Sequence, residues 1–176
     1  RALKKSPKAE TIYALPGNGG IAADAICVEG SATDIDRVVS FSKDNGIDFV
    51  VVAPDNPLVL GMVDALNEAG IATFGPRANA AILEGSKVFS KNLMKKYGIP
   101  TARYETFDDA HAAVAYIEKM NEYPVVIKAD GLALGKGVII AQNFAEAQDA
   151  VKSIMEDKAF GASGNHIVVE QFLEGV

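Results

Sequence analysis

Two lysines and three glycines lie close together in the stretch YPVVIKADGLALGKGVIIAQ, and their types suit the binding of a phosphate group. Lys128 sits inside an apolar run, and Lys136 sits in the loop before the next one. Gly131, Gly135 and Gly137 leave backbone N–H groups unobstructed, and arrays of such groups bind phosphate. The spacing differs from the Walker loop, which has four residues between its glycines and then Lys-Ser or Lys-Thr.

Lys128 itself predicts an anion nearby. An ammonium group in a packed strand is unfavourable unless an anion pairs with it. The alternative is a long hairpin in which Lys128 reaches solvent from an edge strand. The residues of this stretch leave both interpretations open.

A second glycine loop occurs in LPGNGGIAA, where Gly17, Gly19 and Ala22 match the dinucleotide pattern Gly-x-Gly-x-x-Ala. The distance to the next predicted strand is too short for the crossover helix of a dinucleotide-binding fold, which takes at least about 10 residues. We therefore expect a glycine loop that touches a ligand, with a simple turn as the alternative.

A third candidate lies in VAPDNPLVLG, where Asp55 and Asn56 follow an apolar strand and open a helix. In open α/β sheets, ligands collect at the carboxyl ends of strands and beside helix N-termini. These two residues therefore suit a ligand site. Alternatively, both side chains simply cap the helix.

Three further charged positions have weaker signals. Lys87 borders the apolar side of a predicted helix and Lys91 lies farther out, although charges on a helix usually form a solvated face. Glu170 interrupts an apolar strand, so it faces either solvent or a polar ligand. His111 and His166 are expected to be structural or exposed, and no catalytic triad or metal-ligand spacing is present.

The predicted elements change in character near residue 100. Before it, strands alternate with helices, which predicts a parallel α/β sheet, and the apolar strand 47–54 is expected to be buried on both faces. After it, two strands follow each other directly, which predicts a small antiparallel α+β unit. The predicted strands are 11–15, 25–29, 47–54, 71–76, 102–107, 124–129, 137–142 and 166–173, and the helices are 33–46, 56–70, 77–97, 108–120 and 144–155.

Composition excludes several classes of protein. The net charge of −6 argues against a nucleic-acid binder, which would have a basic face. Cys27 is the single cysteine, so no disulfide framework or cysteine-based metal site is expected, and a reducing cytoplasm fits. No apolar run approaches the ~18 residues of a membrane span, and no signal peptide is apparent.

Three stretches from residue 83 onward follow one another in an order typical of a known family: LEGSKVFSKNLMKKYGIPTARYETF, PVVIKADGLALGKGVIIA and FGASGNHIVVEQFLEG. With PGNGG, PDNPLVLGMVDAL and FGP in the first half, they resemble the glycinamide ribonucleotide synthetases, or phosphoribosylamine–glycine ligases, of the ATP-grasp superfamily. The resemblance runs from about Pro16 to the end. It implies a Rossmann-like parallel α/β (pre-ATP-grasp) domain over residues 1–100 and a small α+β ATP-grasp lid over 101–176.

The resemblance also implies a reaction and its partners. ATP phosphorylates the carboxylate of glycine, and the amine of phosphoribosylamine attacks the acyl phosphate to give glycinamide ribonucleotide, ADP and phosphate. Such chemistry needs positioning and charge neutralisation more than a protein nucleophile. The expected small molecules are glycine, phosphoribosylamine and ATP with Mg²⁺ or Mn²⁺. We expect a cytoplasmic monomer that binds neither nucleic acid nor membrane.

The family's functional positions carry over to named residues of this chain. No catalytic residue and no metal ligand is expected within 1–176. The positions that the resemblance assigns to ATP are Lys87, Lys128, Asp130, Gly131, Leu132, Gly135, Lys136, Gly137, Glu170, Gln171, Phe172 and Leu173. The positions that it assigns to the phosphoribosylamine side are Gly17, Asn18, Gly19, Asp55, Asn56 and Pro57.

Two departures affect the acceptor side. Many relatives have Pro-Glu-Ala-Pro where this chain has PDNP, and Gly-Asn-Ala-Gly where it has GNGG.

We expect the chain to be a fragment, because the family's first strand would precede Arg1 and its metal and glycine sites would follow Val176. Two alternatives stay open: an ATP-binding ATP-grasp module without catalysis of its own, and another ATP-grasp carboxylate–amine ligase, which should lack the PGNGG and PDNPLVLG pair.

Overall fold

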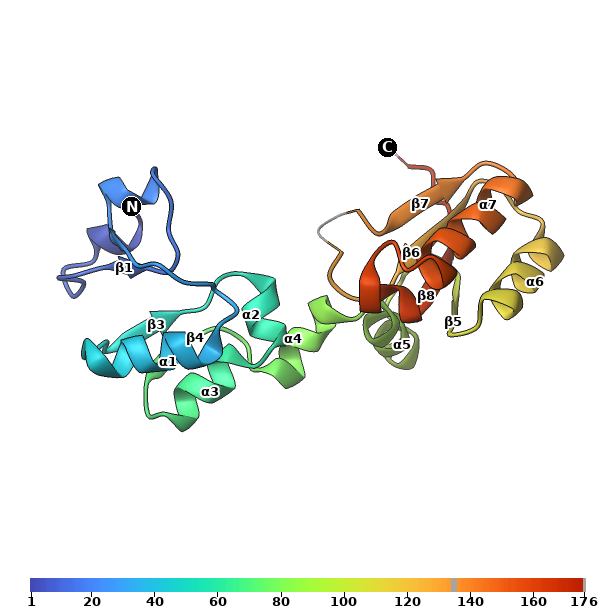
Figure 1. Ribbon diagram of the computed structural model, residues 1–176. Coiled ribbons are helices and arrows are strands. Elements are labelled where there is room, and N and C mark those ends of the chain that lie inside the picture. Colours follow the sequence, from blue (N-terminus) through green and yellow to red (C-terminus); the bar gives the residue numbers. More distant parts are fainter. Residues whose placement is uncertain (134–135, 176) are drawn as a thin grey trace. The chain divides into compact units, whose positions relative to one another are not determined.

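A computed structural model describes residues 1–133 and 136–175, and the chain divides into two compact units, Arg1–Ala81 and Ile82–Val176 (Figure 1). The division comes earlier than the boundary that we expected near residue 100. Hydrogen bonds explain the difference, because residues 86–88 bond to Asp130 and Gly131 in the sheet of the second unit.

The first unit contains four short strands, which lie in two parallel pairs. Tyr13 pairs with Ile26, and Phe49 pairs with Ala72. Parallel strands joined through helical segments confirm a mixed α/β fold here. The elements are η1 (Leu3–Lys5), β1 (Tyr13–Ala14), η2 (Ile21–Ala23), β2 (Ile26–Cys27), α1 (Ile35–Asp44), β3 (Phe49–Val51), α2 (Asp55–Val59), α3 (Met62–Glu68) and β4 (Ala72–Phe74).

Helix α1 lies within the helix predicted over 33–46 and begins at Ile35. The side chain of Asp34 accepts a hydrogen bond from the Arg37 N–H at 3.0 Å, so it satisfies a donor that the first turn would leave free. Ser42 of this helix is buried. The apolar residues of this helix pack against the core of the unit, and the buried members of that core are Val52, Met62, Val63, Leu66 and Ile71.

The predicted helix over 56–70 is wrong in its details, because the structure has two helices there. Gly61 has φ +91°, a left-handed conformation that glycine adopts without steric cost, and it separates α2 from α3. The N-cap of α2 is Pro54 and no side chain caps it, so Asp55 and Asn56 do not cap this helix in the way that the alternative interpretation required.

The predicted helix over 77–97 is likewise two helices, α4 (Ala78–Gly85) and α5 (Lys87–Tyr97). Ser86 is extended, with φ −142°, and its hydroxyl accepts a hydrogen bond from the Phe89 N–H at 3.0 Å. Serine favours such N-cap positions over helix interiors, which is the local reason for the break.

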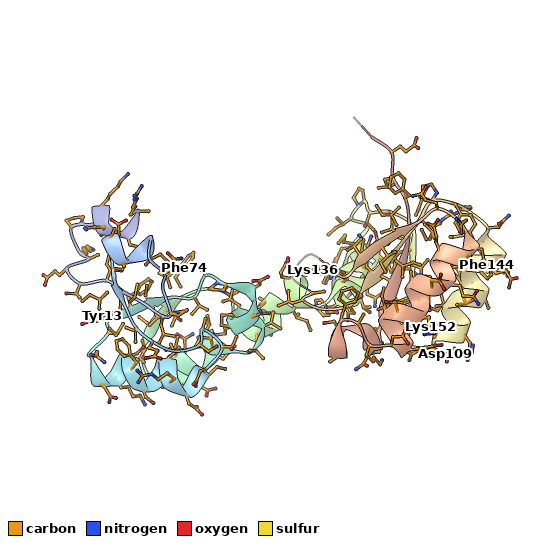
Figure 2. The ribbon with its side chains drawn as sticks, turned by 45° about the horizontal axis from the view of Figure 1, so that its top comes forward. Tyr13, Phe74, Asp109, Lys136, Phe144 and Lys152 are labelled. Atoms are coloured by element: carbon orange, nitrogen blue, oxygen red, sulfur yellow. The ribbon has the colours of Figure 1, made fainter. Side chains whose placement is uncertain are left out.

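The expectation that strand β3 is buried on both faces is also wrong for this structure. Phe49 is 55% exposed and Val51 is 40% exposed, and Phe74 on the paired strand β4 is 67% exposed (Figure 2). An apolar run indicates that a strand can be covered on both sides, but burial depends on which elements pack over it.

The second unit is built on one antiparallel sheet with the strand order β5-β8-β6-β7, which confirms the predicted antiparallel α+β unit. Strand β6 therefore lies inside the sheet between β8 and β7. Besides α5, the elements are β5 (Tyr104–Phe107), α6 (Ala110–Met120), β6 (Val125–Ala129), β7 (Val138–Ala141), α7 (Phe144–Val151), the π-helix η3 (Lys152–Glu156), η4 (Gly161–Asn165) and β8 (Ile167–Gln171).

Helices α6 and α7 lie side by side over one face of this sheet (Figure 1). That face buries Val125, Ile127 and Val169 against Ile117 of α6 and Val151 of α7. Side chains alternate along a strand, so the residues between these three point to the opposite face. In residues 1–133 and 136–175, no helix is both long and apolar enough to cross a membrane.

Candidate functional site

Strand register gathers charged residues on the sheet face opposite α6 and α7. Glu170 of β8 lies opposite Tyr104 of β5 on one side and Val126 of β6 on the other. Lys128 is two residues beyond Val126 and therefore projects from the same face. Diagonal neighbours of this kind are within reach of long side chains.

Glu170 is the centre of a three-residue ion cluster, which we call the Glu170 cluster: Lys91, Lys128 and Glu170. Glu170 is 5% exposed. Its Oε2 accepts a hydrogen bond from Lys128 Nζ at 2.9 Å, and its Oε1 lies 3.2 Å from Lys91 Nζ. An anion therefore does pair with Lys128, and Lys128 lies on an interior strand, which excludes the edge-strand alternative.

Lys91 is the residue that the sequence interpretation missed. We expected it farther out on its helix, yet it is 7% exposed. Its Nζ donates a hydrogen bond to the Thr101 hydroxyl at 2.7 Å and lies 5.3 Å from the centre of the Tyr104 ring. The signal that could have found it is the four-residue spacing from Lys87, which puts both lysines on one helix face.

Tyr104 closes the cluster on the β5 side. Burial raises the pKa of its phenol, and the neighbouring Glu105 carboxylate raises that pKa further. The phenol therefore stays protonated at neutral pH and donates a hydrogen bond to Asn92 Oδ1 at 3.2 Å. This bond fixes the ring beside the Lys91 ammonium.

A second set of contacts ties the start of α5 to the end of β6. Asp130 Oδ1 accepts a hydrogen bond from the Val88 N–H and Oδ2 accepts one from the Ser86 hydroxyl, both at 3.1 Å. Lys87 Nζ donates to the Gly131 carbonyl oxygen at 2.7 Å. Lys87 and Asp130 are thus held within one network one helical turn from Lys91.

The charges and surfaces around Lys128 suit a ligand that has both an anionic and an apolar part. Two ammonium groups surround one carboxylate, so the Glu170 cluster carries an excess positive charge. The Lys128 side chain is 27% exposed, so part of it faces solvent. In the sheet, Val138 lies opposite Lys128 and Ile140 opposite Val126, so both lie on this face, and they are 42% and 46% exposed.

The remaining positions assigned to ATP have less definite contacts. Lys136 is exposed on the loop between β6 and β7 (Figure 2), and the Gly137 carbonyl accepts the Ala129 N–H at 2.8 Å. Leu132 is half-buried, whereas Gly135 lies outside the described residues. At and beyond the end of β8, Gln171 and Leu173 are exposed and Phe172 is half-buried.

The positions assigned to phosphoribosylamine all lie in the first unit. Asn18 and Gly19 are exposed after β1, and Asn18 Oδ1 accepts the Ile21 N–H at 3.0 Å. Asp55 and Asn56 are exposed in the first turn of α2. The exposed and half-buried positions are Gly17, Asn18, Gly19, Asp55 and Asn56, and the buried one is Pro57. Within the described part of the unit, no hydrogen bond joins Gly17–Gly19 to Asp55–Pro57.

The described residues also do not meet the requirements of a metal site. Over residues 1–133 and 136–175, no group of three or more histidine, cysteine, aspartate or glutamate side chains is arranged to hold a metal ion. The carboxylate of Glu170 is instead engaged by two ammonium groups.

Comparisons with known proteins give the same family for both halves of the chain. Residues 1–84 match the phosphoribosylglycinamide synthetase N domain, and residues 85–176 match the ATP-grasp (A) domain of the same synthetase. The chloroplastic phosphoribosylamine–glycine ligase of Arabidopsis thaliana is 50% identical over 99% of this chain and 33% of its own length. The Vibrio cholerae phosphoribosylamine–glycine ligase is 44% identical over 98% of this chain and 41% of its own length.

A solved structure agrees. The crystal structure of phosphoribosylamine–glycine ligase from Thermotoga maritima matches with a TM-score of 0.73 and 31% identity, over 94% of this chain and 39% of that one. The chain thus spans well under half the length of these three relatives. Because the two family models together cover all 176 residues, the chain belongs to the phosphoribosylglycinamide synthetase family.

Proposed function

We propose that the protein containing this chain joins glycine to 5-phosphoribosylamine, using ATP, and releases glycinamide ribonucleotide, ADP and phosphate. The observation that carries this proposal is the match of both halves, in order, to the two domains of one synthetase. The presence of the N domain favours it over another ATP-grasp carboxylate–amine ligase. The reaction would be a step of de novo purine synthesis.

ATP would lie on the open face of the second unit. Lys128 would contact a phosphate through its ammonium group, since its side chain is partly exposed. The exposed side chains of Val138 and Ile140 would contact the flat apolar faces of the adenine ring. Backbone groups of 171–173, which follow Glu170 in the chain, would border the edge of that ring.

The remaining ATP contacts come from α5 and the glycine loop. Lys87 would exchange its present partner, the Gly131 carbonyl, for a phosphate oxygen. Lys136 and the bare N–H groups of the glycine loop would add donors. Each ammonium would neutralise negative charge on the phosphoryl group as it moves from ATP to the glycine carboxylate. Stabilising this charge in the transition state is how such enzymes lower the barrier.

The first unit would receive phosphoribosylamine. Gly17–Gly19 follow a strand end, and Asp55–Pro57 open helix α2, which are positions where α/β proteins collect small ligands. We propose that the two parallel strand pairs form part of a single Rossmann-like sheet in this domain. The Mg²⁺ or Mn²⁺ that accompanies ATP would take its ligands from outside residues 1–176, and the protein would act as a cytoplasmic monomer.

A coupled assay of ADP release on the protein at its natural length tests the function. We expect release that requires glycine and phosphoribosylamine together, with glycinamide ribonucleotide detected by mass spectrometry. ADP release that is unchanged when glycine is left out would refute the proposal. Substituting D-alanine or bicarbonate for glycine should give no product, which separates this ligase from other ATP-grasp enzymes.

A second candidate function concerns the 176 residues by themselves. They cover 33% to 41% of the length of the two curated relatives, which favours a nucleotide-binding module that performs no ligation alone. Calorimetric titration of the isolated chain with ADP should then show binding while the ADP-release assay shows none. Turnover by the isolated chain would refute this second candidate.

A further inference from the structure

We infer that Lys91 is a positioning residue for nucleotide binding: it occupies one oxygen of Glu170, so that Lys128 is engaged by the other oxygen alone and its ammonium group can also bind phosphate. This inference rests on the proposed function, because Lys128 is taken there to contact ATP. Lys91 itself is not placed in contact with the nucleotide.

The two oxygens of Glu170 are divided between two lysines. Oε2 accepts the hydrogen bond from Lys128, whereas Oε1 lies 3.2 Å from Lys91 Nζ. Among the described residues, Oε1 has no hydrogen-bond donor, so Coulombic attraction holds it to Lys91. Attraction at this separation is strong because Glu170 is 5% exposed and its carboxylate is therefore poorly screened by water.

Lys91 is held in place by groups other than Glu170. The Thr101 hydroxyl accepts its hydrogen bond at 2.7 Å, and the Tyr104 ring lies 5.3 Å away. The Lys91 side chain is 9% exposed, compared with 27% for that of Lys128. Lys91 is therefore fixed and enclosed, and Lys128 is the ammonium that a dissolved anion can approach.

Removal of the Lys91 charge would change what Lys128 can do. A buried carboxylate with one free oxygen is unfavourable, so both oxygens of Glu170 would turn to the remaining ammonium. Lys128 would then be fully neutralised within the protein and would have to break that pair to bind phosphate. The expected consequence is weaker nucleotide binding without the loss of any ligand contact.

The test measures the KM for ATP of four natural-length proteins. They are the unmodified protein, Lys91→Met, Lys128→Met and the double variant. Coupled charges typically change binding by about tenfold, so we expect Lys91→Met to raise the KM for ATP by about that factor. In the Lys128→Met background, the same substitution should change KM by less than about twofold. The KM for glycine should stay as in the unmodified protein.

Two matched variants separate positioning from general stability. Lys95→Met removes an exposed lysine one turn later on α5 and should leave the KM for ATP unchanged. Lys91→Arg keeps the charge next to Glu170 and should recover most of the affinity. If Lys91→Met does not fold, Thr101→Val is used in its place, because it removes only the hydroxyl that holds Lys91. Thr101→Val should also raise the KM for ATP, and this increase should vanish in the Lys128→Met background.

Three outcomes overturn the inference. The first is a Lys91→Met protein with an unchanged KM for ATP and only a lower melting temperature. The second is an equal effect with and without Lys128, and the third is a Lys91→Arg protein no better than Lys91→Met. Failure of the proposed function is a separate result: the unmodified protein then releases no glycine-dependent ADP. In that case the dissociation constants for ADP of the same variants, measured by titration, replace the KM values. The same three outcomes then overturn the inference.

Discussion

At the scale of single residues, Glu170 has a role that its place in the sequence only partly reveals. The sequence predicts a carboxylate facing either solvent or a polar ligand, whereas the structure buries it between Lys91 and Lys128. Breaking a buried ion cluster is more costly than never building one, because a charge left without a partner cannot be solvated by water. Glu170 therefore stabilises the second unit as well as orienting its lysines.

Glu170→Gln should lower the free energy of unfolding by about 3 kcal/mol, because it leaves two ammonium groups without their carboxylate. Urea denaturation followed by circular dichroism measures this change. Glu118→Gln, at an exposed position on α6, is the control and should change the free energy by less than about 0.5 kcal/mol. Equal effects of the two substitutions would show that the Glu170 cluster contributes nothing to stability.

At the scale of elements, the short helix η4 depends on a glycine for its approach to the π-helix η3. A Cβ added at Gly164 would overlap the backbone carbonyl oxygen of Ile154. Backbone atoms cannot rotate away as a side chain can, so the two elements would have to separate. Ile154 is fully buried in the main core, and strand β8 follows η4 directly, so a shift here would be transmitted to the strand that carries Glu170.

Gly164→Ala should lower the free energy of unfolding by about 2 kcal/mol through this overlap. The midpoint of urea unfolding reports the change. As a control, Ala162→Ser alters an exposed residue of the same short helix and should have an effect below about 0.5 kcal/mol. A Gly164→Ala protein as stable as this control would mean that η4 and η3 are less tightly packed than the structure indicates.

At the scale of the whole molecule, the two units differ in how well each is buried. In the described residues, the main core of the second unit has thirteen buried members, and that of the first has five. The first unit also exposes large apolar side chains on its strands, among them Ile26, Phe49 and Phe74. Burial of apolar area is the dominant favourable contribution to folding, so the second unit should be the more stable.

Residues 82–176 should therefore fold as an isolated polypeptide, with a cooperative urea transition and dispersed amide signals in an NMR spectrum. Residues 1–81 should unfold at lower urea and bind a hydrophobic dye such as ANS, because their strands expose apolar side chains. The reverse order of stability, or a disordered second unit, would contradict the expected dependence on core size.

Some structural features of this protein follow from local sequence alone. Asp34 and Asp109 each cap a helix that the sequence predicts, because a short acidic side chain satisfies the free N–H groups of the first turn whatever lies farther away. The antiparallel pairing of β6 with β7 also follows, because strands joined by a short loop have no room for a crossover. Family membership was evident from the order of short motifs along the chain.

Other features were decided by tertiary contacts. Lys91 and Glu170 are far apart in sequence, and Lys91 on a polar helix looks solvated until β8 and Tyr104 are placed against it. The exposure of Phe49 likewise depends on neighbours that a local pattern does not specify. Sequence thus determines which helix or strand a short segment can form, whereas the pairing of buried charges is settled only when distant segments pack together. The reason is that the energy of an ion pair depends on the separation of the charges and on the exclusion of water around them.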